Sequence, residues 1–320
     1  GGFGRWMTRG LGVQVRSVLR VLGMRRPLVW IACPAAAHIL DGLREAAGVV
    51  YQYSDCYTAL QNGDACAVGD LERRIAQRAD LVICSSILLH ERARRLYGQG
   101  EYVDHGVDFA LFDSARDARV APPELAGLRR PIAGFFGNMD GNTVDRRLLE
   151  EVVRLRPQYS FALVGRMAAD FESLRKHRNV VSIPQQPYRR VPQYGAAFDV
   201  CLMPWLRNEW IAHCNPVKLK EYLALGKPIV STSFPELRRC EGLCYEADTP
   251  GEFAAAIDRA LAEDSPARQG ERREWAARHT WDVKFERVLE LLEARGIRTD
   301  GRVRADDKNR CRSDIVAIAG

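Results

Sequence analysis

The feature that most constrains this chain is a repeated alternation of short apolar runs with longer stretches of helical spacing. Runs rich in β-branched and aromatic residues predict strands, and the stretches between them predict helices. Strands joined through helices form parallel sheets, because a parallel connection must cross back over the sheet. The predicted strands are residues 27–33, 48–54, 79–86 and 102–105, followed by residues 131–137, 160–165, 179–183, 199–204, 228–232 and 243–246.

A proline-bounded stretch at residues 120–131 separates the two series of strands and predicts a linker. A length of 320 residues suits two domains. We therefore predict an α/β protein with two Rossmann-like, doubly wound domains, at residues 1–124 and 125–295. The first series has only three or four strands, so the first domain is expected to be truncated at its N-terminal side. Residues 296–320 are polar without periodicity and are predicted to be disordered.

The last predicted helix follows Thr280, which is placed as its N-terminal cap. Apolar side chains at helical spacing predict that this helix buries a single stripe. The stripe consists of Phe285, Val288, Leu289 and Leu292.

Basic residues are concentrated at the beginning of the chain, where no acidic residue precedes Asp41. Apolar residues recur among them at helical spacing, which predicts a basic amphipathic helix. Two interpretations are open: a peripheral contact with anionic lipid or a lipid-linked acceptor, or a helix packed on its own domain with a solvated basic side. The arginines are Arg5, Arg9, Arg16, Arg20, Arg25 and Arg26, and the apolar residues are Leu11, Val15, Val18, Leu19 and Leu22.

Composition argues against several classes of protein. No apolar run is long enough to span a bilayer and no secretory leader is seen, so we expect a cytoplasmic protein, with the inner face of the membrane as its one peripheral location. The nine cysteines are scattered, and the close pair Cys240 and Cys244 lacks a second pair at zinc spacing, so we interpret this pair as structural. No acidic or histidine pair at metal spacing occurs, and no metal is expected. The basic residues show no aromatic-interleaved patch, so no nucleic acid is expected.

The most informative segment is residues 215–232, which read NPVKLKEYLALGKPIVST. They predict a helix with both ends marked and a strand after it. Asn215 is placed as the N-terminal cap and Pro216 at the first helical position, and Gly226 suits the position just past the end.

Lys218 and Glu221 share one face near the start of this predicted helix. A helix N-terminus has free N–H groups and partial positive charge, so it favours a diphosphate. Lys218 adds a full positive charge, and the carboxylate of Glu221 can accept from two adjacent ribose hydroxyls. The alternative is a well-capped surface helix with an incidental lysine and glutamate.

Other candidates lie where predicted strands end. Gly137, Asn138 and Asp140 belong to a loop between a strand and a helix, as phosphate-binding loops do, although a plain turn explains them equally well. Asp55 follows a strand at a position typical of binding residues in doubly wound domains, or serves as a turn residue. His105 stands near a strand end and could approach a bound sugar, or is a loop histidine bonded to backbone.

The segment from Arg207 to Glu236 resembles the donor-binding signature of group 1 (family 4) glycosyltransferases. It is most like members that read Asn-Pro-x-Lys-x-x-Glu-Tyr-Leu-Ala-x-Gly-Lys-Pro and act in cell-surface polysaccharide or teichuronic-acid synthesis. Residues 128–140, 79–86 and 105–108 are also similar to stretches of this family. The resemblance covers residues 27–295.

The resemblance implies a GT-B fold, in which two Rossmann-like domains face each other across a cleft. It implies a glycosyltransferase of the hexosyltransferase type, acting in cell-envelope glycan assembly. A UDP- or GDP-sugar would be the donor and a glycan or lipid-linked molecule the acceptor. The reaction would retain the anomeric configuration and need neither metal nor cofactor. Lys218 would bind the donor phosphates, Glu221 the ribose, and the loop Gly137–Gly141 would face donor or acceptor.

The chain departs from the family at His213, where many members have a glutamate that touches the transferred sugar. His213 is therefore a candidate sugar contact, and Glu209 is a neighbouring substitute. This departure and the incomplete first domain leave two alternatives open. One is an inactive nucleotide-sugar-binding relative or subunit, and the other is a nucleotide-sugar epimerase of the same fold.

Overall fold

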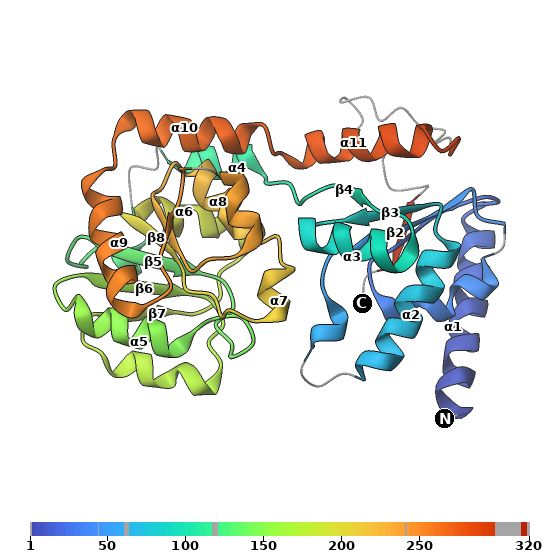
Figure 1. Ribbon diagram of the computed structural model, residues 1–320, viewed down its shortest axis with the longest axis horizontal. Coiled ribbons are helices and arrows are strands. Elements are labelled where there is room, and N and C mark those ends of the chain that lie inside the picture. The colour runs from blue at the N-terminus through green and yellow to red at the C-terminus, as the bar shows by residue number, and fades with distance from the viewer. Residues whose placement is uncertain are drawn as a thin grey trace. The chain divides into compact units, whose positions relative to one another are not determined.

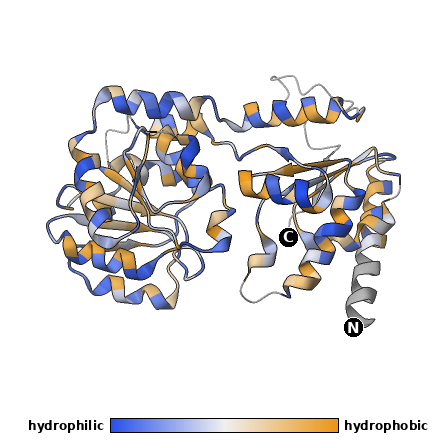
Figure 2. Cartoon of the chain, in the orientation of Figure 1, coloured by the Kyte–Doolittle hydropathy of each residue, from blue (hydrophilic) through white to orange (hydrophobic). Residues whose placement is uncertain are grey.

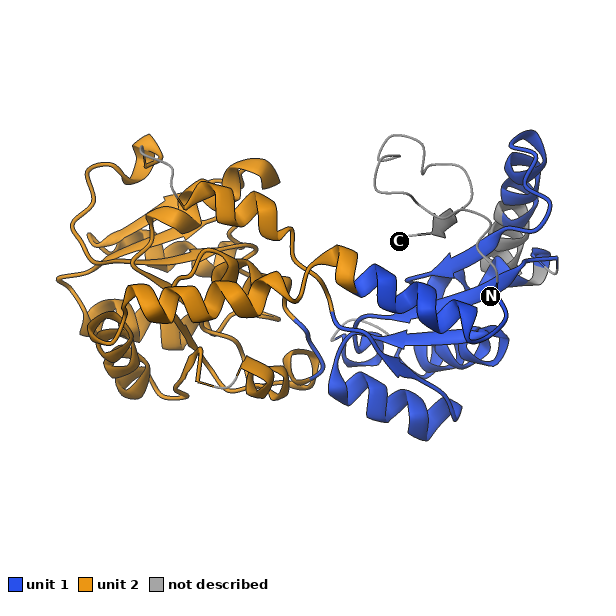
Figure 3. Ribbon diagram, turned by 90° about the horizontal axis from the view of Figure 1, so that it is seen from above, with its two compact units in different colours: residues 1–104, 213–215, 284–320 blue, residues 105–212, 216–283 orange. Residues whose placement is uncertain are grey.

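The computed structural model describes residues 2–43, 45–60, 64–116, 121–240, 242–297 and 315–318, with backbone alone for 2–11, 41 and 315–318 (Figure 1). The chain forms two compact units, shown in blue and orange in Figure 3. Unit 1 contains residues 1–104, 213–215 and 284–320. Unit 2 contains residues 105–212 and 216–283.

This division differs from the predicted one at both ends. The chain enters unit 2 after residue 104, so the stretch predicted as a linker lies inside that unit. The reason is α4 (Phe109–Ala115), an unpredicted helix that packs against two helices of unit 2, α6 and α8. After residue 283 the chain returns to unit 1, because the far end of α11 (Trp281–Glu293) packs on the core of that unit.

Unit 2 is built on a six-stranded parallel sheet in the order β10-β9-β8-β5-β6-β7. This is the order of a complete Rossmann domain, and its direction of winding switches between β5 and β8. Every strand predicted for this half of the chain is present. The strands are β5 (Ile132–Phe136), β6 (Ser160–Val164), β7 (Val180–Ile183), β8 (Val200–Met203), β9 (Ile229–Ser231) and β10 (Tyr245–Glu246).

The central strands of this sheet are buried on both faces. Figure 2 colours these strands largely as hydrophobic. Gly134 in β5 is required by packing, since a Cβ there would lie 2.1 Å from the ring of Phe198. The helices of unit 2 besides α4 are α5 (Arg146–Leu155), α6 (Val191–Ala197), α7 (Glu209–Ala212), α8 (Val217–Ala224), α9 (Pro250–Ala262) and α10 (Pro266–Ala277). The 3-10 helices are η4 (Pro123–Leu125), η5 (Ala169–Lys176), η6 (Tyr188–Arg190) and η7 (Pro235–Cys240).

Helix α8 is attached to the sheet through its second turn. The backbone N–H of Phe136 in β5 donates to the hydroxyl of Tyr222, 3.1 Å away, and the centres of the two rings are 4.5 Å apart. Past the C-terminal end of the helix, Gly226 has φ +73°, and Gly226 and Lys227 donate to the carbonyls of Leu223 and Tyr222 in a Schellman motif. The buried guanidinium of Arg272 in α10 donates to the carbonyl of Gly226.

Unit 1 has a five-stranded parallel sheet in the order β11-β1-β2-β3-β4. The four strands predicted for this half are present, and β11 adds to them, running parallel to β1 with Ile315 opposite Leu28. The prediction of disorder is therefore wrong for residues 315–318, where a β-branched run within polar surroundings forms a strand. The rest of the predicted tail beyond residue 297 lies outside the described residues. The strands are β1 (Leu28–Ile31), β2 (Gly48–Tyr53), β3 (Leu81–Cys84), β4 (Glu101–Tyr102) and β11 (Ile315–Ile318).

The helix predicted at the beginning of the chain is present as α1 (Gly2–Val21). Leu19 is buried and Val15 packs against the core of unit 1, whereas Val18 and Leu22 are 56 % and 62 % exposed. The predicted apolar face is thus divided between the core and the surface. Among the described residues, no helix has the length and apolar character that a bilayer crossing requires. The other helices of unit 1 are η1 (Pro34–His38), η2 (Leu40–Gly42), η3 (Tyr57–Ala59), α2 (Ala65–Arg78) and α3 (Ile87–Tyr97).

Thr280 caps α11 as predicted, because its hydroxyl accepts from the N–H of Val283 at 3.3 Å. The predicted stripe of this helix is rotated. Val288 and Leu292 are buried as expected, but Leu291 is buried with them while Phe285 is 36 % exposed.

A buried carboxylate in unit 1 links the stability of this unit to pH. Glu72 on α2 is 1 % exposed, and one of its oxygens accepts from the hydroxyl of Tyr97 at 3.2 Å. The other oxygen has no hydrogen-bond partner among the described residues. Burial raises the pKa of Glu72 from about 4.5 to about 7, despite the opposing effects of Tyr97 and Arg92.

We predict that unit 1 loses stability as the pH rises from 4.5 towards 7 and above. The folded state keeps a proton on Glu72 that the unfolded state releases, so the free energy of unfolding falls by up to about 3 kcal/mol. In Glu72→Gln this pH dependence is absent. The free energy of unfolding of the variant, relative to that of the parent, therefore increases as the pH rises. Urea unfolding of both proteins at about pH 5 and pH 8 measures the difference. The same change in the free energy of unfolding between these two pH values in both proteins would contradict the prediction.

Candidate functional site

Unit 2 contains a cavity of about 470 Å³ at the carboxyl ends of its central strands. In doubly wound sheets, ligands bind at these ends, next to the point where the direction of winding switches. Here β5 and β6 contribute their terminal residues, the connection after β7 contributes a second wall, and α8 contributes its first turns. The lining residues are Phe136, Gly137, Asn138, Val164, Gly165, Gln185, Gln186, Tyr188, Val191, Pro216, Val217, Lys218 and Glu221.

Two glycines form a bare backbone wall in this cavity. The N–H of Gly137 donates to the carbonyl of Val164 at 2.8 Å, which continues the β5–β6 pairing one step beyond the strands. Gly137 has φ +132° and Gly165 has φ +142°, conformations that side chains disfavour. A Cβ on Gly165 would lie 2.1 Å from the carbonyl oxygen of Gly137. The close approach of β5 and β6 at this point therefore requires glycine at residue 165.

Lys218 projects from the first turn of α8 onto two aromatic rings. Its ammonium lies 4.2 Å from the ring centre of Phe135 and 4.5 Å from that of Trp205, at the switch between β5 and β8. It also lies against Gly137, where an added Cβ would be 2.6 Å from Nζ. Burial lowers the pKa of Lys218 to about 8, although the carboxylates of Glu221 and Asp140 act in the opposite direction. The rings stabilise a cation that is partly removed from water.

Glu221 lies one turn further along α8 and is 7 % exposed. Its Oε1 accepts from the hydroxyl of Tyr188 at 3.0 Å. Burial raises the pKa of Glu221 to about 6, against the opposing effects of the Tyr188 hydrogen bond and the Lys218 charge. A cation and an anion thus stand side by side in one cavity, and both ionise within two pH units of neutrality.

The start of α8 differs from the prediction by one residue. The helix begins at Val217, and Pro216 rather than Asn215 occupies the cap position. Proline has no side-chain acceptor, so the residue at the cap position makes no side-chain cap hydrogen bond. Asn215 is buried one residue earlier and is grouped with unit 1. The start of α8 borders the cavity, and the N–H groups of a helix start suit an anion.

The remaining predicted site residues lie outside the cavity lining. Asp140 accepts from the N–H of Asn142 at 3.0 Å, as in a turn, while its charge acts on Lys218. His105 lies in a loop of unit 2 with its ring 6.0 Å from that of Trp281. Asp55 follows β2 and belongs to unit 1.

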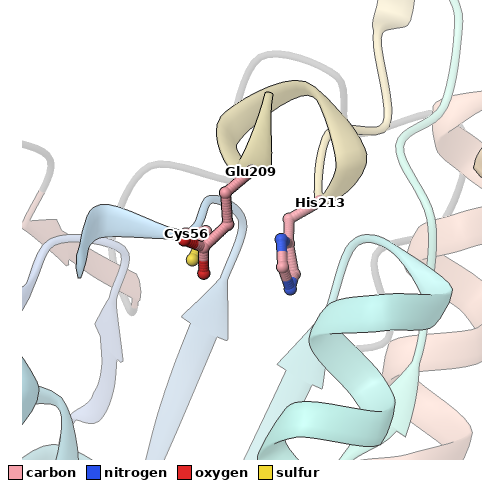
Figure 4. A group of neighbouring side chains, drawn as sticks. All are labelled: Cys56, Glu209 and His213. Carbon is pink, nitrogen blue, oxygen red and sulfur yellow. The ribbon is translucent and has the colours of Figure 1, made fainter. Parts of the chain in front are cut away.

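Figure 4 labels Cys56, Glu209 and His213, which are of residue types that bind metal ions. Glu209 begins α7 and His213 directly follows this helix, whereas Cys56 follows β2. Cys56 and His213 are grouped with unit 1 and Glu209 with unit 2, and we assign no metal site to them. His213, the predicted sugar contact, is thus not part of the lining described above.

Residues 130–263 match the family model of the group 1 glycosyl transferases, and this stretch includes the whole lining of the cavity. Over this stretch the chain is similar to that family, as the sequence predicts. The matched stretch covers most of unit 2, the Rossmann-like unit that contains the cavity. The predicted class of enzyme, a glycosyltransferase, is confirmed.

Known proteins similar to this glycosyltransferase point the same way. The putative teichuronic acid biosynthesis glycosyltransferase TuaH of Bacillus subtilis is 27 % identical over 288 residues, which are 82 % of this chain and 71 % of TuaH. Sucrose-phosphate synthase from Thermosynechococcus elongatus has a TM-score of 0.72 at 19 % identity, covering 91 % of this chain and 78 % of the synthase. Anabaena HepE in complex with UDP and glucose has a TM-score of 0.67 at 16 % identity, covering 88 % and 81 %. The predicted GT-B fold is confirmed by these structures.

Sequence reasoning missed the side of the cavity that faces α8. Tyr188 and the pair Gln185 and Gln186 lie after β7, in the connection to α6. Their position directly after a predicted strand was an available signal, because strand ends border the binding crevice of this fold. Trp205 stands in the same relation to β8. No local pattern indicated that its ring would pack against Lys218.

We predict that Gly165→Ala lowers the free energy of unfolding by about 2 kcal/mol or more, because the new Cβ collides with the Gly137 peptide in a strained conformation. Gly127→Ala is the control, since no atom lies within 4 Å of its added Cβ. It should change stability by less than about 0.5 kcal/mol. Urea unfolding measures both variants. Stability in Gly165→Ala equal to that of Gly127→Ala would show that the glycine wall is dispensable.

Proposed function

We propose that this glycosyltransferase moves a hexose from a UDP- or GDP-sugar to a glycan or lipid-linked acceptor. The observation that carries the proposal is the placement of Lys218 and Glu221 in one cavity, beside the start of α8. A nucleotide diphosphate sugar has two negatively charged phosphates next to a ribose with two adjacent hydroxyls. The cavity offers a cation and a carboxylate one helical turn apart, in matching order.

The diphosphate is the group that Lys218 and the start of α8 would bind. At neutral pH most Lys218 side chains are protonated, because the pKa of Lys218, although lowered by burial, is about 8. The N–H groups at a helix start add partial positive charge. As the bond to the sugar breaks, negative charge grows on the departing diphosphate, and donors placed in advance stabilise it. In this way the first turn of α8 would promote the transfer as well as bind the donor.

The ribose is the group that Glu221 would bind. A carboxylate can accept from both ribose hydroxyls, and the burial of Glu221 makes each such bond stronger than it would be in water. The glycine wall at Gly137 and Gly165 lets a ligand approach the backbone closely. Asn138, which follows the wall, would contact the phosphates or the sugar.

We extend the proposal to a metal-independent reaction without a cofactor, in which the anomeric configuration is retained. Divalent ions that hold a diphosphate are usually bound by more than one acidic group. In the lining of the cavity, as far as the structure describes it, Glu221 is the one carboxylate. Lys218 would take the place of the ion. Retention follows from the family resemblance.

The similar proteins support the donor and the setting. HepE is described in complex with UDP and glucose, which favours a uridine diphosphate donor of hexose. TuaH is described as a teichuronic acid biosynthesis enzyme, which favours a cytoplasmic role in cell-envelope polysaccharide assembly. An inactive relative or an epimerase is less well supported, since both the matched family and TuaH are described as glycosyltransferases.

We predict that Lys218→Ala weakens the binding of UDP- and GDP-sugars at least about tenfold, because a charge-assisted contact to phosphate is lost. The fold should persist, since Nζ contacts rings and backbone and its removal leaves no buried acceptor unpaired. Lys176→Ala removes an exposed lysine of unit 2 and is the control. Isothermal titration calorimetry with both donors measures the change. Unchanged affinity in Lys218→Ala would show that the phosphates bind elsewhere.

We also propose that α1 makes a peripheral contact with an anionic membrane. Leu19 attaches the helix to unit 1. Val13 on α1 is exposed, and so are Val18, Val21 and Leu22 towards its end, of which Val21 is 87 % exposed. Arg20, exposed on α1, and Arg25 and Arg26, exposed after it, surround this end of the helix with positive charge. Apolar side chains beside arginines are typical of helices that lie on anionic lipid. Such a contact would bring the enzyme to a lipid-linked acceptor.

We predict that replacing Arg20, Arg25 and Arg26 by glutamate lowers binding to phosphatidylglycerol vesicles at least about a hundredfold, since each basic residue contributes about 1 kcal/mol. The measurement is co-sedimentation with vesicles at low salt. Vesicles of phosphatidylcholine alone should bind neither protein.

The matched control carries the same change of charge on unit 2, at the exposed residues Arg154, Arg175 and Arg278. An equal loss of vesicle binding in the two triple variants would show that the effect depends only on net charge. Either that result, or no binding of the parent protein to anionic vesicles, would refute the membrane contact.

A further inference from the structure

Tyr188 combines two properties that make it more than a wall of the cavity. It is 48 % exposed, yet its hydroxyl is bonded to Oε1 of the almost fully buried Glu221. It also lines the same cavity as Lys218. The phenol of Tyr188 therefore connects the cavity, where a ligand would bind, with a buried carboxylate. From this position it can influence the orientation and the charge of that carboxylate.

Packing holds the ring of Tyr188 in this position. The ring of Tyr188 packs edge to face against that of Phe112, with 5.9 Å between the ring centres and 62° between the planes. Phe112 is fully buried on α4, and α4 packs against both α6 and α8. Pro187 comes directly before Tyr188 and restricts the backbone where η6 begins. The phenol is therefore placed before any ligand arrives.

We propose that Tyr188 is a positioning residue that holds Glu221 in the orientation and the ionised state needed to accept the ribose hydroxyls of the donor. This inference rests on the proposed function, since it assigns a second residue to the recognition of the same ribose. The phenol donates to one carboxylate oxygen. That bond fixes the rotation of the carboxylate about its last torsion and so determines where the second oxygen lies.

The charge of Glu221 depends on the same bond. Burial raises the pKa of Glu221 to about 6, and the Tyr188 hydrogen bond is the first influence that opposes burial. Without the phenol the pKa of Glu221 would rise towards neutrality. A protonated carboxyl group has given one of its acceptor positions to the proton, so it can no longer accept from two hydroxyls equally well.

The other groups near Glu221 are accounted for. On α8 itself, Lys218 favours the charged form of Glu221. Asp108, which caps α4, acts on Tyr188, and burial, Glu221 and Asp108 together raise the pKa of Tyr188 well above its usual range. Tyr188 is therefore a neutral donor at every pH at which the site works. On β5, the N–H of Phe136 bonds to Tyr222 and not to the carboxylate.

Helix α10, the other helix packed on α8, keeps its nearby cations engaged elsewhere. Arg272 is bound to Asp264 at 2.6 Å and to the carbonyl of Gly226. Arg273 is bound to Asp113 at 2.6 Å. The pKa of Glu221 is thus set by burial, by the Tyr188 hydrogen bond and by the Lys218 charge.

The test is the binding of a donor sugar to Tyr188→Phe between about pH 5 and pH 7.5, measured by isothermal titration calorimetry. The probe is UDP-glucose or GDP-mannose, whichever binds the parent more tightly, since the diphosphate of either stays ionised over this range. We expect binding about three- to tenfold weaker near neutral pH, and a pH midpoint about one unit higher than in the parent. A purely structural role for Tyr188 would lower affinity at all pH values without moving the midpoint.

Tyr159→Phe is the matched control, because the hydroxyl of Tyr159 also donates to a carboxylate of unit 2, Asp258, at 2.8 Å. It should leave both affinity and midpoint unchanged. A Tyr188→Phe midpoint equal to that of the parent overturns the inference. So does tighter binding in Tyr188→Phe, which would mean that the phenol occupies the place of a ribose hydroxyl and has to leave.

Glu221→Gln separates this inference from the proposed function. If the parent binds neither donor, or if Glu221→Gln binds as the parent does, the proposed function fails. If Glu221→Gln weakens binding and removes its pH dependence while Tyr188→Phe behaves as the parent, only the role of Tyr188 fails.

Discussion

The site depends on how α8 is attached to β5. The hydroxyl of Tyr222 accepts the N–H of Phe136, the last residue of that strand, and this bond lies in the buried core. It fixes the second turn of the helix to the end of β5, the strand next to which the sheet changes its direction of winding. At that point β5 turns away at Gly137, and the side chain of Lys218 fills the space a Cβ would take. Helix, strand end and lysine therefore form one rigid arrangement.

Partial removal from water is what prepares the two charged groups of this arrangement. Burial lowers the pKa of Lys218 to about 8 and raises that of Glu221 to about 6, so both groups are less stable as ions than they would be at the surface. A ligand that brings phosphates to the lysine and hydroxyls to the carboxylate supplies the partners that water no longer provides. The aromatic rings and the phenol hold these groups until then.

Much of this could be predicted from local patterns. The central strands of both sheets, such as β3, β5, β6 and β8, are runs buried on both faces, which the residue types alone indicate, and Gly226 marked the end of α8 correctly. The start of that helix was misjudged, because Asn215 is a strong cap in isolation while its neighbour Pro216 takes the position. The aromatic contacts of Lys218 and the bond from Tyr188 join residues 13 to 83 positions apart in sequence. Such contacts are set by tertiary packing, which no local pattern contains.

The path of the chain between its units has a consequence for any attempt to divide the protein. Figure 3 shows α11 beginning in unit 2 and continuing in unit 1, where Val288, Leu291 and Leu292 complete a core with Leu28 and Val50. A shortened gene ending after residue 283 would leave those strands without their cover. Chimeras that exchange one half of the enzyme must therefore transfer the final helix together with the first strands, although almost the whole sequence separates them.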